Sequence, residues 1–327
     1  MKNTTPPSLV VFTASLLAIT LASCAKPPAN TTATTPTPST ATAENQATAN
    51  QTDADKDLEQ RLRAICDRAQ GFVGLAVTHV ETGRTIAVNA QTKLPLYSVF
   101  KLPLAIAVLK DVEANRLKID QVVHVTPYDI VPGAPENTAL WREPVDRTIA
   151  ELIEVSIARS DNTSTEKLLH LVGGPARVTE NMRALGLNGI DIRYTIMDIV
   201  NAREKMNTGT AADLVNLLVQ LQKGNVLAPA HTNLLIDDMR KTTTGPKRIP
   251  GDMPGGTVVA HKTGSGERDP STSIPKATND VGLITLPNGL GTLAIAVLVS
   301  ESKVSDTAQE KVIAELARTV YDAFITK

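Results

Sequence analysis

The sequence contains few aromatic residues and has no excess of positive charge. Phe, Trp and Tyr make up 3% of its 327 residues, which gives no surface for stacking nucleic acid bases. Lys and Arg (33) nearly balance Asp and Glu (34), so the net charge of −1 provides no basic face for a phosphate backbone. We therefore expect no nucleic acid partner.

Signatures of phosphate and metal binding are also missing. The chain has no Gly-x-x-x-x-Gly-Lys loop, and its five histidines show no His-x-x-x-His spacing. We expect no metal ion and no cofactor.

The amino-terminal segment is unlike the remainder of the chain. Residues 9–22 are mostly apolar but too few to span a bilayer. They lead into Leu21-Ala22-Ser23-Cys24, which resembles the signal of bacterial lipoproteins, in which the cysteine is lipidated after cleavage. An ordinary secretory signal is the alternative. We predict an exported protein with a signal peptide over residues 1–24, whose only membrane contact is a lipid on Cys24 at the periplasmic side of an envelope membrane.

Residues 25–53 are rich in Pro, Thr, Ala, Ser and Asn and have almost no apolar content. Such a composition cannot bury a core and indicates a disordered tether. Cys66 is the only other cysteine, so no internal disulfide is expected if Cys24 carries lipid. Its apolar neighbours at helical spacing predict a buried side chain.

The remainder of the chain is patterned as strands at both ends with helices between them. Strands are expected at 72–80, 84–90, 258–263, 280–286 and 293–300, and helices at 55–70, 99–115, 148–157, 162–171, 176–185, 211–222 and 304–325. This arrangement predicts an α/β fold. One domain (54–97 and 243–327) has an antiparallel sheet flanked by helices, and it packs against an all-helical domain (98–242).

Three short motifs carry the candidate chemistry, in the order Ser98-Val99-Phe100-Lys101, Ser160-Asp161-Asn162 and Lys262-Thr263-Gly264. A serine hydroxyl is a weak nucleophile and needs a nearby base, and Lys101 lies on the same face of a helix as Ser98. Each motif alone has a structural explanation, because Ser98 and Ser160-Asp161-Asn162 can cap helices. Ser-x-x-Lys also occurs at Ser164, Ser273 and Ser300, where the context favours solvated faces and loops.

The set of motifs resembles the active-site serine β-lactamases and penicillin-binding proteins, and class A β-lactamases in particular, over residues 54–327. The resemblance implies a β-lactamase/transpeptidase-like fold and catalytic roles for Ser98, Lys101 and Ser160. Ser160 would pass a proton to the leaving nitrogen. Asn162 would bind the substrate's side-chain amide, and Lys262 and Thr263 its carboxylate. The backbone N–H groups of Ser98 and Ser265 would form the oxyanion hole, with Arg268 and Lys276 as further candidates for the carboxylate.

The sequence departs from the class A pattern at one position. The glutamate that activates the deacylating water should follow the turn at Gly173-Gly174-Pro175, and counting forward without gaps places Ile196 there. An isoleucine cannot act as a general base. Asp198 could replace the glutamate, whereas Glu166 is expected to steady the loop through a hydrogen bond.

Two enzymatic functions follow from the resemblance. The first is a β-lactamase that hydrolyses penicillins or cephalosporins through an acyl-enzyme on Ser98. The alternative is a D-alanyl-D-alanine carboxypeptidase or related penicillin-binding enzyme that deacylates slowly, with peptidoglycan stem peptides as ligands. A third possibility is not enzymatic: a β-lactam sensor or cell-wall-binding lipoprotein that uses the same pocket.

Overall fold

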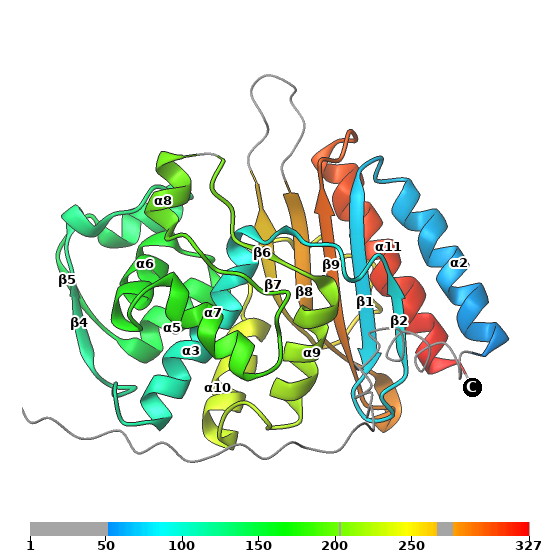
Figure 1. Cartoon of the computed structure of the whole chain (residues 1–327), viewed down its shortest axis with the longest axis horizontal. Coiled ribbons are helices and arrows are strands. Elements are labelled where there is room, and N and C mark those ends of the chain that lie inside the picture. The colour runs from blue at the N-terminus through cyan, green and yellow to red at the C-terminus, as the bar shows by residue number, and fades with distance from the viewer. Residues whose placement is uncertain (1–51, 203, 267–276, 327) are drawn as a thin grey trace, which may run out of the picture. The chain divides into compact units, whose positions relative to one another are not determined.

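A five-stranded antiparallel sheet lies in the middle of the structure (Figure 1). The computed structural model describes residues 52–202, 204–266 and 277–326. The strands run in the order β2 (Thr85–Val88), β1 (Phe72–His79), β9 (Thr292–Ser300), β8 (Ala277–Thr285) and β7 (Val259–Ser265). β1 pairs with β9 along its whole length, from Phe72 opposite Ser300 to His79 opposite Leu293. The sheet therefore joins the two ends of the folded chain, as predicted.

One face of the sheet is covered by α2 (Asp53–Asp67) and α11 (Asp306–Ile325) (Figure 1). Apolar residues of both helices form one core with the sheet, and Cys66 lies in this core as a buried free thiol, as predicted. Thr52 caps α2 in a capping box with Asp55. Because of this cap the helix begins at Asp53, so the predicted tether to residue 53 is slightly too long.

The other face of the sheet packs against the helical part of the chain. This part contains α3 (Lys101–Glu113), α4 (Pro135–Thr138), α5 (Ile149–Ala158), α6 (Asn162–Leu171), α7 (Pro175–Ala184), α8 (Ile196–Asn201), α9 (Ala211–Gln222) and α10 (Pro229–Arg240). It also contains the paired short strands β3 (Leu94–Pro95) with β6 (Thr208–Gly209), and β4 (Val122–Val125) with β5 (Val145–Thr148). Short 3₁₀ turns lie at Tyr97–Phe100 (η1), Pro127–Asp129 (η2), Ala139–Trp141 (η3) and Pro287–Gly289 (η4).

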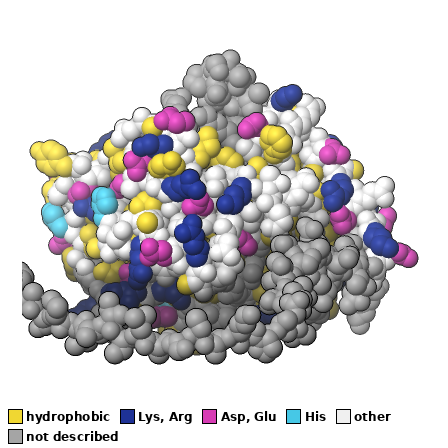
Figure 2. Space-filling model, viewed as in Figure 1, with side chains coloured by type: hydrophobic (Ala, Val, Ile, Leu, Met, Phe, Trp, Pro, Cys, Tyr) yellow, Lys and Arg dark blue, Asp and Glu magenta, His cyan; other side chains and the backbone are white. Residues whose placement is uncertain are grey.

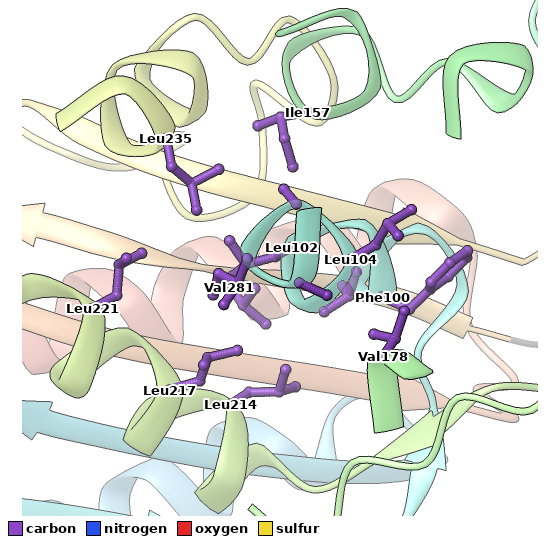
Figure 3. Packing of buried hydrophobic residues seen from close by; sticks show 14 of the residues in the cluster. Phe100, Leu102, Leu104, Ile157, Val178, Leu214, Leu217, Leu221, Leu235 and Val281 are labelled. Atoms are coloured by element: carbon purple, nitrogen blue, oxygen red, sulfur yellow. The ribbon is translucent and has the colours of Figure 1, made fainter. Parts of the chain in front are cut away.

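α3 is the central helix of this layer. Every residue from Lys101 to Leu109 is buried, and a helix that is apolar on all sides needs neighbours all round. Figure 3 shows these neighbours: Ile157 of α5, Val178 of α7, Leu214 to Leu221 of α9, Leu235 of α10 and Val281 of β8. Burying each leucine of α3 contributes about 1.5–3 kcal/mol. The start of α3, where the first motif lies, is thereby held in a close-packed surrounding.

The hydrophobic core of the helices continues onto the sheet, where Ala260, Val281 and Leu298 belong to the same cluster as α3. The division of the folded region at residues 98 and 243 stays a prediction. The signal peptide (1–24), Cys24 and residues 25–51 lie outside the described residues. None of the helices in the described ranges is long and apolar enough to cross a membrane.

Candidate active site

Ser98 lies in the turn η1, directly before α3. The sequence predicts a helix from residue 99, but the first turn is 3₁₀ and the α-helix begins at Lys101, whose N–H donates to the carbonyls of Ser98 and Val99. N–H groups in the first turn of a helix have no partner within that helix. The preceding residue, Tyr97, has a left-handed backbone with φ 44°. This segment packs closely against β7. The approach is so close that a Cβ added to Gly264 would collide with Leu96 O.

Lys101 is completely buried and its ammonium reaches the second motif. Its Nζ donates to Ser160 O at 2.6 Å, to Asn162 Oδ1 at 2.9 Å and to Asp161 O at 3.2 Å. Ser160 Oγ lies 3.5 Å from the same nitrogen. Desolvation lowers the pKa of Lys101 to about 7, against the opposing effect of the Asp161 carboxylate. A substantial fraction of this amine is therefore neutral near pH 7.

Ser160 connects two lysines. Its Oγ accepts a hydrogen bond from Lys262 Nζ at 2.9 Å and lies near Lys101. Its backbone is left-handed, with φ 57°. Asp161 then caps α6 by accepting from Ser164 N, and it also accepts from Trp141 Nε1 at 3.2 Å. The motif is thus both a helix cap and part of the site.

Asn162 is engaged at both ends of its side chain. Its Oδ1 accepts from Lys101, and its Nδ2 donates to Pro132 O at 2.5 Å. Nδ2 carries a second hydrogen, which is the one available for a substrate amide.

Lys262 is also fully buried, on the edge strand β7. It donates to Ser160 Oγ and, at 2.9 Å, to Thr263 O. Desolvation, followed by the nearby Lys101, holds the pKa of Lys262 well below its usual value. The two buried amines therefore lie on either side of one hydroxyl.

Thr263 and Ser265 follow Lys262 along β7. Thr263 Oγ1 shares a hydrogen bond of 2.5 Å with Thr244 Oγ1. Gly266 N donates to Ala277 O, and in an antiparallel ladder hydrogen-bonded and non-hydrogen-bonded pairs alternate. The pair of Ser265 with Thr278 is then of the second kind, so the Ser265 N–H points outward from the edge of the sheet.

Sequence reasoning missed Arg248. This nearly buried guanidinium donates to Ser265 Oγ at 2.8 Å and to Asn279 O at 2.9 Å, and it pairs with Glu310 at 3.2 Å. It lies in a Gly- and Pro-rich connection, where no periodicity marks it as part of a site. Arg268 and Lys276, the cations that the sequence suggests beside β7, lie outside the described residues.

The loop where class A enzymes carry the deacylation glutamate ends in α8. Ile196 is the first residue of this helix and is buried, and its N–H donates to Glu166 Oε2 at 2.9 Å. The hydrogen bond predicted between Glu166 and this loop is therefore present, and its effect on the loop stays a prediction. Asp198 forms a capping box with Thr195 and contacts Lys205 Nζ at 3.3 Å. The hydrogen bond from Thr195 N, helped by Lys205, lowers the pKa of Asp198, which makes this carboxylate a weaker base.

Basic and acidic side chains are interspersed on the face shown in Figure 2. In the part of the chain that the structure describes, no group of His, Cys, Asp and Glu side chains is arranged to hold a metal ion. The chemistry available in these residues is that of hydroxyls, amines and backbone N–H groups.

Comparison with known proteins agrees with this geometry. A model of the beta-lactamase enzyme family matches residues 57–324. Beta-lactamase VEB-1 of Pseudomonas aeruginosa is 30% identical, over 85% of this chain and 92% of its own length. The extended-spectrum beta-lactamase PER-1 of the same species is 32% identical, over 83% of this chain and 88% of its own length.

Solved structures show the same similarity. A beta-lactamase from Chitinophaga pinensis has a TM-score of 0.78 at 36% identity, covering 82% of this chain and 99% of its own. TLA-1 extended-spectrum beta-lactamase has a TM-score of 0.79 at 34% identity, covering 84% of this chain and 100% of its own. A class A beta-lactamase from Bacteroides cellulosilyticus also matches, with a TM-score of 0.78 at 28% identity. The chain therefore belongs to the beta-lactamase enzyme family and has the class A fold.

Proposed function

We propose that this β-lactamase opens the ring of penicillins and cephalosporins through an ester with Ser98. The observation that carries the proposal is the position of Ser160 Oγ, which lies 2.9 Å from Lys262 Nζ and 3.5 Å from Lys101 Nζ. The two buried amines lie on either side of one hydroxyl, at the start of α6. Together they form a path for protons between nucleophile and leaving group.

In acylation, Ser98 Oγ attacks the lactam carbonyl carbon while neutral Lys101 takes the hydroxyl proton. The C–N bond of the ring then breaks, Ser160 gives its proton to the nitrogen, and Lys101 passes the proton taken from Ser98 back to Ser160. The N–H groups of Ser98 and Ser265 hold the oxyanion, and losing one such donor costs about 3 kcal/mol. Lys262, Thr263 and Arg248 provide the cationic and hydroxyl groups that would hold the substrate's carboxylate.

In deacylation, water attacks the ester carbon and the bond to Ser98 Oγ breaks, which releases the ring-opened acid. Ile196 supplies no base for this step. The named relatives are β-lactamases, so the carboxypeptidase alternative is not favoured. A D-alanyl-D-alanine peptide carries a similar carboxylate, and we expect it to compete for the same groups.

The test mixes the purified protein with a chromogenic cephalosporin and follows both colour and intact mass. Sustained colour development together with a transient adduct supports the proposal, and Ser98→Ala should abolish both. Ser300→Ala, which changes another Ser-x-x-Lys serine, is the matched control and should keep them. A permanent adduct would indicate the slow-deacylation alternative, and no adduct would overturn the assignment.

For location, we propose export and a lipid anchor on Cys24, supported by the apolar stretch 9–22 and Leu21-Ala22-Ser23-Cys24. Expression of the full chain in a bacterium fed a labelled fatty acid tests this. The label should be incorporated and the protein should fractionate with membranes. Cys24→Ser should lose both properties, whereas Cys66→Ser should keep them.

A further inference from the structure

The backbone segment that leads into Ser98 is held from one side by a short two-stranded sheet. Leu94 and Pro95 pair with Gly209 and Thr208. The next residue, Leu96, donates its N–H to Asn207 O at 2.8 Å. These contacts use the groups on one edge of the segment and leave the carbonyls of Pro95 and Leu96 on the other edge.

Asn279 of β8 binds both of these carbonyls. Its side chain is completely buried, and Nδ2 donates to Pro95 O at 2.8 Å and to Leu96 O at 3.1 Å. Its Oδ1 accepts from Val299 N at 3.1 Å. Both hydrogens of the amide and its oxygen therefore have partners, and only this orientation of the amide satisfies them. Such a group is costly to bury unless it is fully bonded.

The residue that follows these carbonyls is conformationally strained. Tyr97 is left-handed (φ 44°) without being glycine, which costs about 1–2 kcal/mol. Its ring lies against Gly266, where an added Cβ would collide with it. A strained residue persists only where its surroundings determine it. The conformation of Tyr97 sets the direction in which the chain enters Ser98.

We propose that Asn279 is a positioning residue for the nucleophile: its amide holds the peptide groups before Tyr97 so that Ser98 is presented to the substrate. This inference rests on the proposed role of Ser98. Asn279 acts through the backbone and does not itself react.

The structure separates this role from binding of the substrate's carboxylate. Arg248, which contacts Ser265, is held by the backbone oxygen of Asn279 and not by its side chain. Replacing the side chain therefore leaves the partner of Arg248 in place. Loss of the amide should affect the rate of acylation and leave ground-state binding nearly unchanged.

The experiment is stopped-flow acylation by a chromogenic cephalosporin, which gives a limiting rate and a half-saturating concentration. For Asn279→Ala we expect the limiting rate to fall about 10²-fold, the scale of loss for a misplacement of about 1 Å, at a similar half-saturating concentration. Ser302→Ala is the structural control, since this buried hydroxyl also binds a backbone carbonyl, Ala69 O, away from the motifs. It should lower the melting temperature without lowering the acylation rate.

A second variant tests the link to Tyr97. Glycine adopts the left-handed conformation without strain, so Asn279→Ala should lower the acylation rate by a smaller factor in a Tyr97→Gly background than in the wild type.

If Asn279→Ala shows no cooperative melting, Asn279→Asp takes its place, because it keeps the shape and the acceptor for Val299 N.

A folded Asn279 variant that acylates at the wild-type rate would overturn the inference. The inference would also fail if Asn279→Ala reduced the acylation rate by the same factor in the Tyr97→Gly background as in the wild type. If the wild-type protein itself forms no adduct, the proposed function fails instead. The two failures are thus distinguishable.

Discussion

The hydroxyl of Ser160 accepts a hydrogen bond from Lys262 Nζ at 2.9 Å, across 102 positions of sequence. The bond links the start of α6 to the edge strand of the sheet. The hydroxyl of Ser160 is thus oriented by an amine that is completely buried.

Replacing Lys262 should therefore slow acylation. For Lys262→Met we expect a fall of about 10²-fold or more, the scale of loss for a positioned proton-transfer group, because Ser160 loses the donor that orients it. The acylation rate is measured by stopped flow. Lys311→Met, at an exposed lysine paired with Asp252, serves as the control and should acylate normally. An equal rate in both variants would remove Lys262 from the proton path.

Acylation should also depend on pH through Lys101. The amine must be neutral to accept the Ser98 proton, and its pKa is lowered to about 7. The limiting rate should therefore be low below pH 7, rise through it and level off above it. A rate that is flat from pH 5 to pH 9 would contradict Lys101 as the base. The measurement needs single turnover, so that deacylation does not contribute.

Asp198→Asn should have little effect on deacylation. Its carboxylate already caps α8 and contacts Lys205, so we expect much less than the roughly 10²-fold loss that removal of a general base causes. The decay of the isolated acyl-enzyme, followed by mass, gives the rate. A loss of that size or more would identify Asp198 as the replacement for the missing glutamate.

Glu166→Leu should loosen the loop that ends in α8. The Ile196 N–H would lose its acceptor, and an unsatisfied buried donor costs about 1–3 kcal/mol. We expect lower stability in urea and faster hydrogen exchange at residues 195–201. Glu166→Gln keeps an acceptor oxygen and should behave almost like the wild type. Equal exchange in both variants would show that the hydrogen bond does not hold the loop.

Gly264→Ala should push η1 away from β7. An added Cβ would overlap Leu96 O and lie 3.1 Å from Val99 N, and overpacking of this kind typically costs about 1–3 kcal/mol. Both thermal stability and the acylation rate should fall. Gly255→Ala, where a Cβ meets nothing within 4 Å, is the control. An unchanged acylation rate in Gly264→Ala would show that this close approach is not required.

The elements with strong periodicity could be predicted from the sequence, as could the motifs whose residue types indicate a specific chemistry. Lys101, Ser160 and Lys262 lie together in the structure. This proximity could be expected because each residue belongs to a recognisable motif. Arg248 and Asn279 could not be found in this way. Both act through hydrogen bonds to distant backbone oxygens, and no local pattern records such partners.

Boundaries were harder to predict than elements. β8 begins at Ala277, ahead of the expected residue 280, because Thr278 and Asn279 are polar residues that the fold buries. The 3₁₀ turn at Ser98 likewise depends on contacts with β7 and β8 that hydropathy does not contain.

The position of β9 has a consequence for how the enzyme is made. This strand lies between the amino-terminal hairpin and β8, and its Val299 N binds the side chain of Asn279. A nascent chain that has not yet emerged beyond residue 300 cannot complete the sheet, so about 200 residues after Ser98 must be synthesised before the reactive serine is oriented. Contacts this distant in sequence make folding slow, and a prematurely terminated product would be inert.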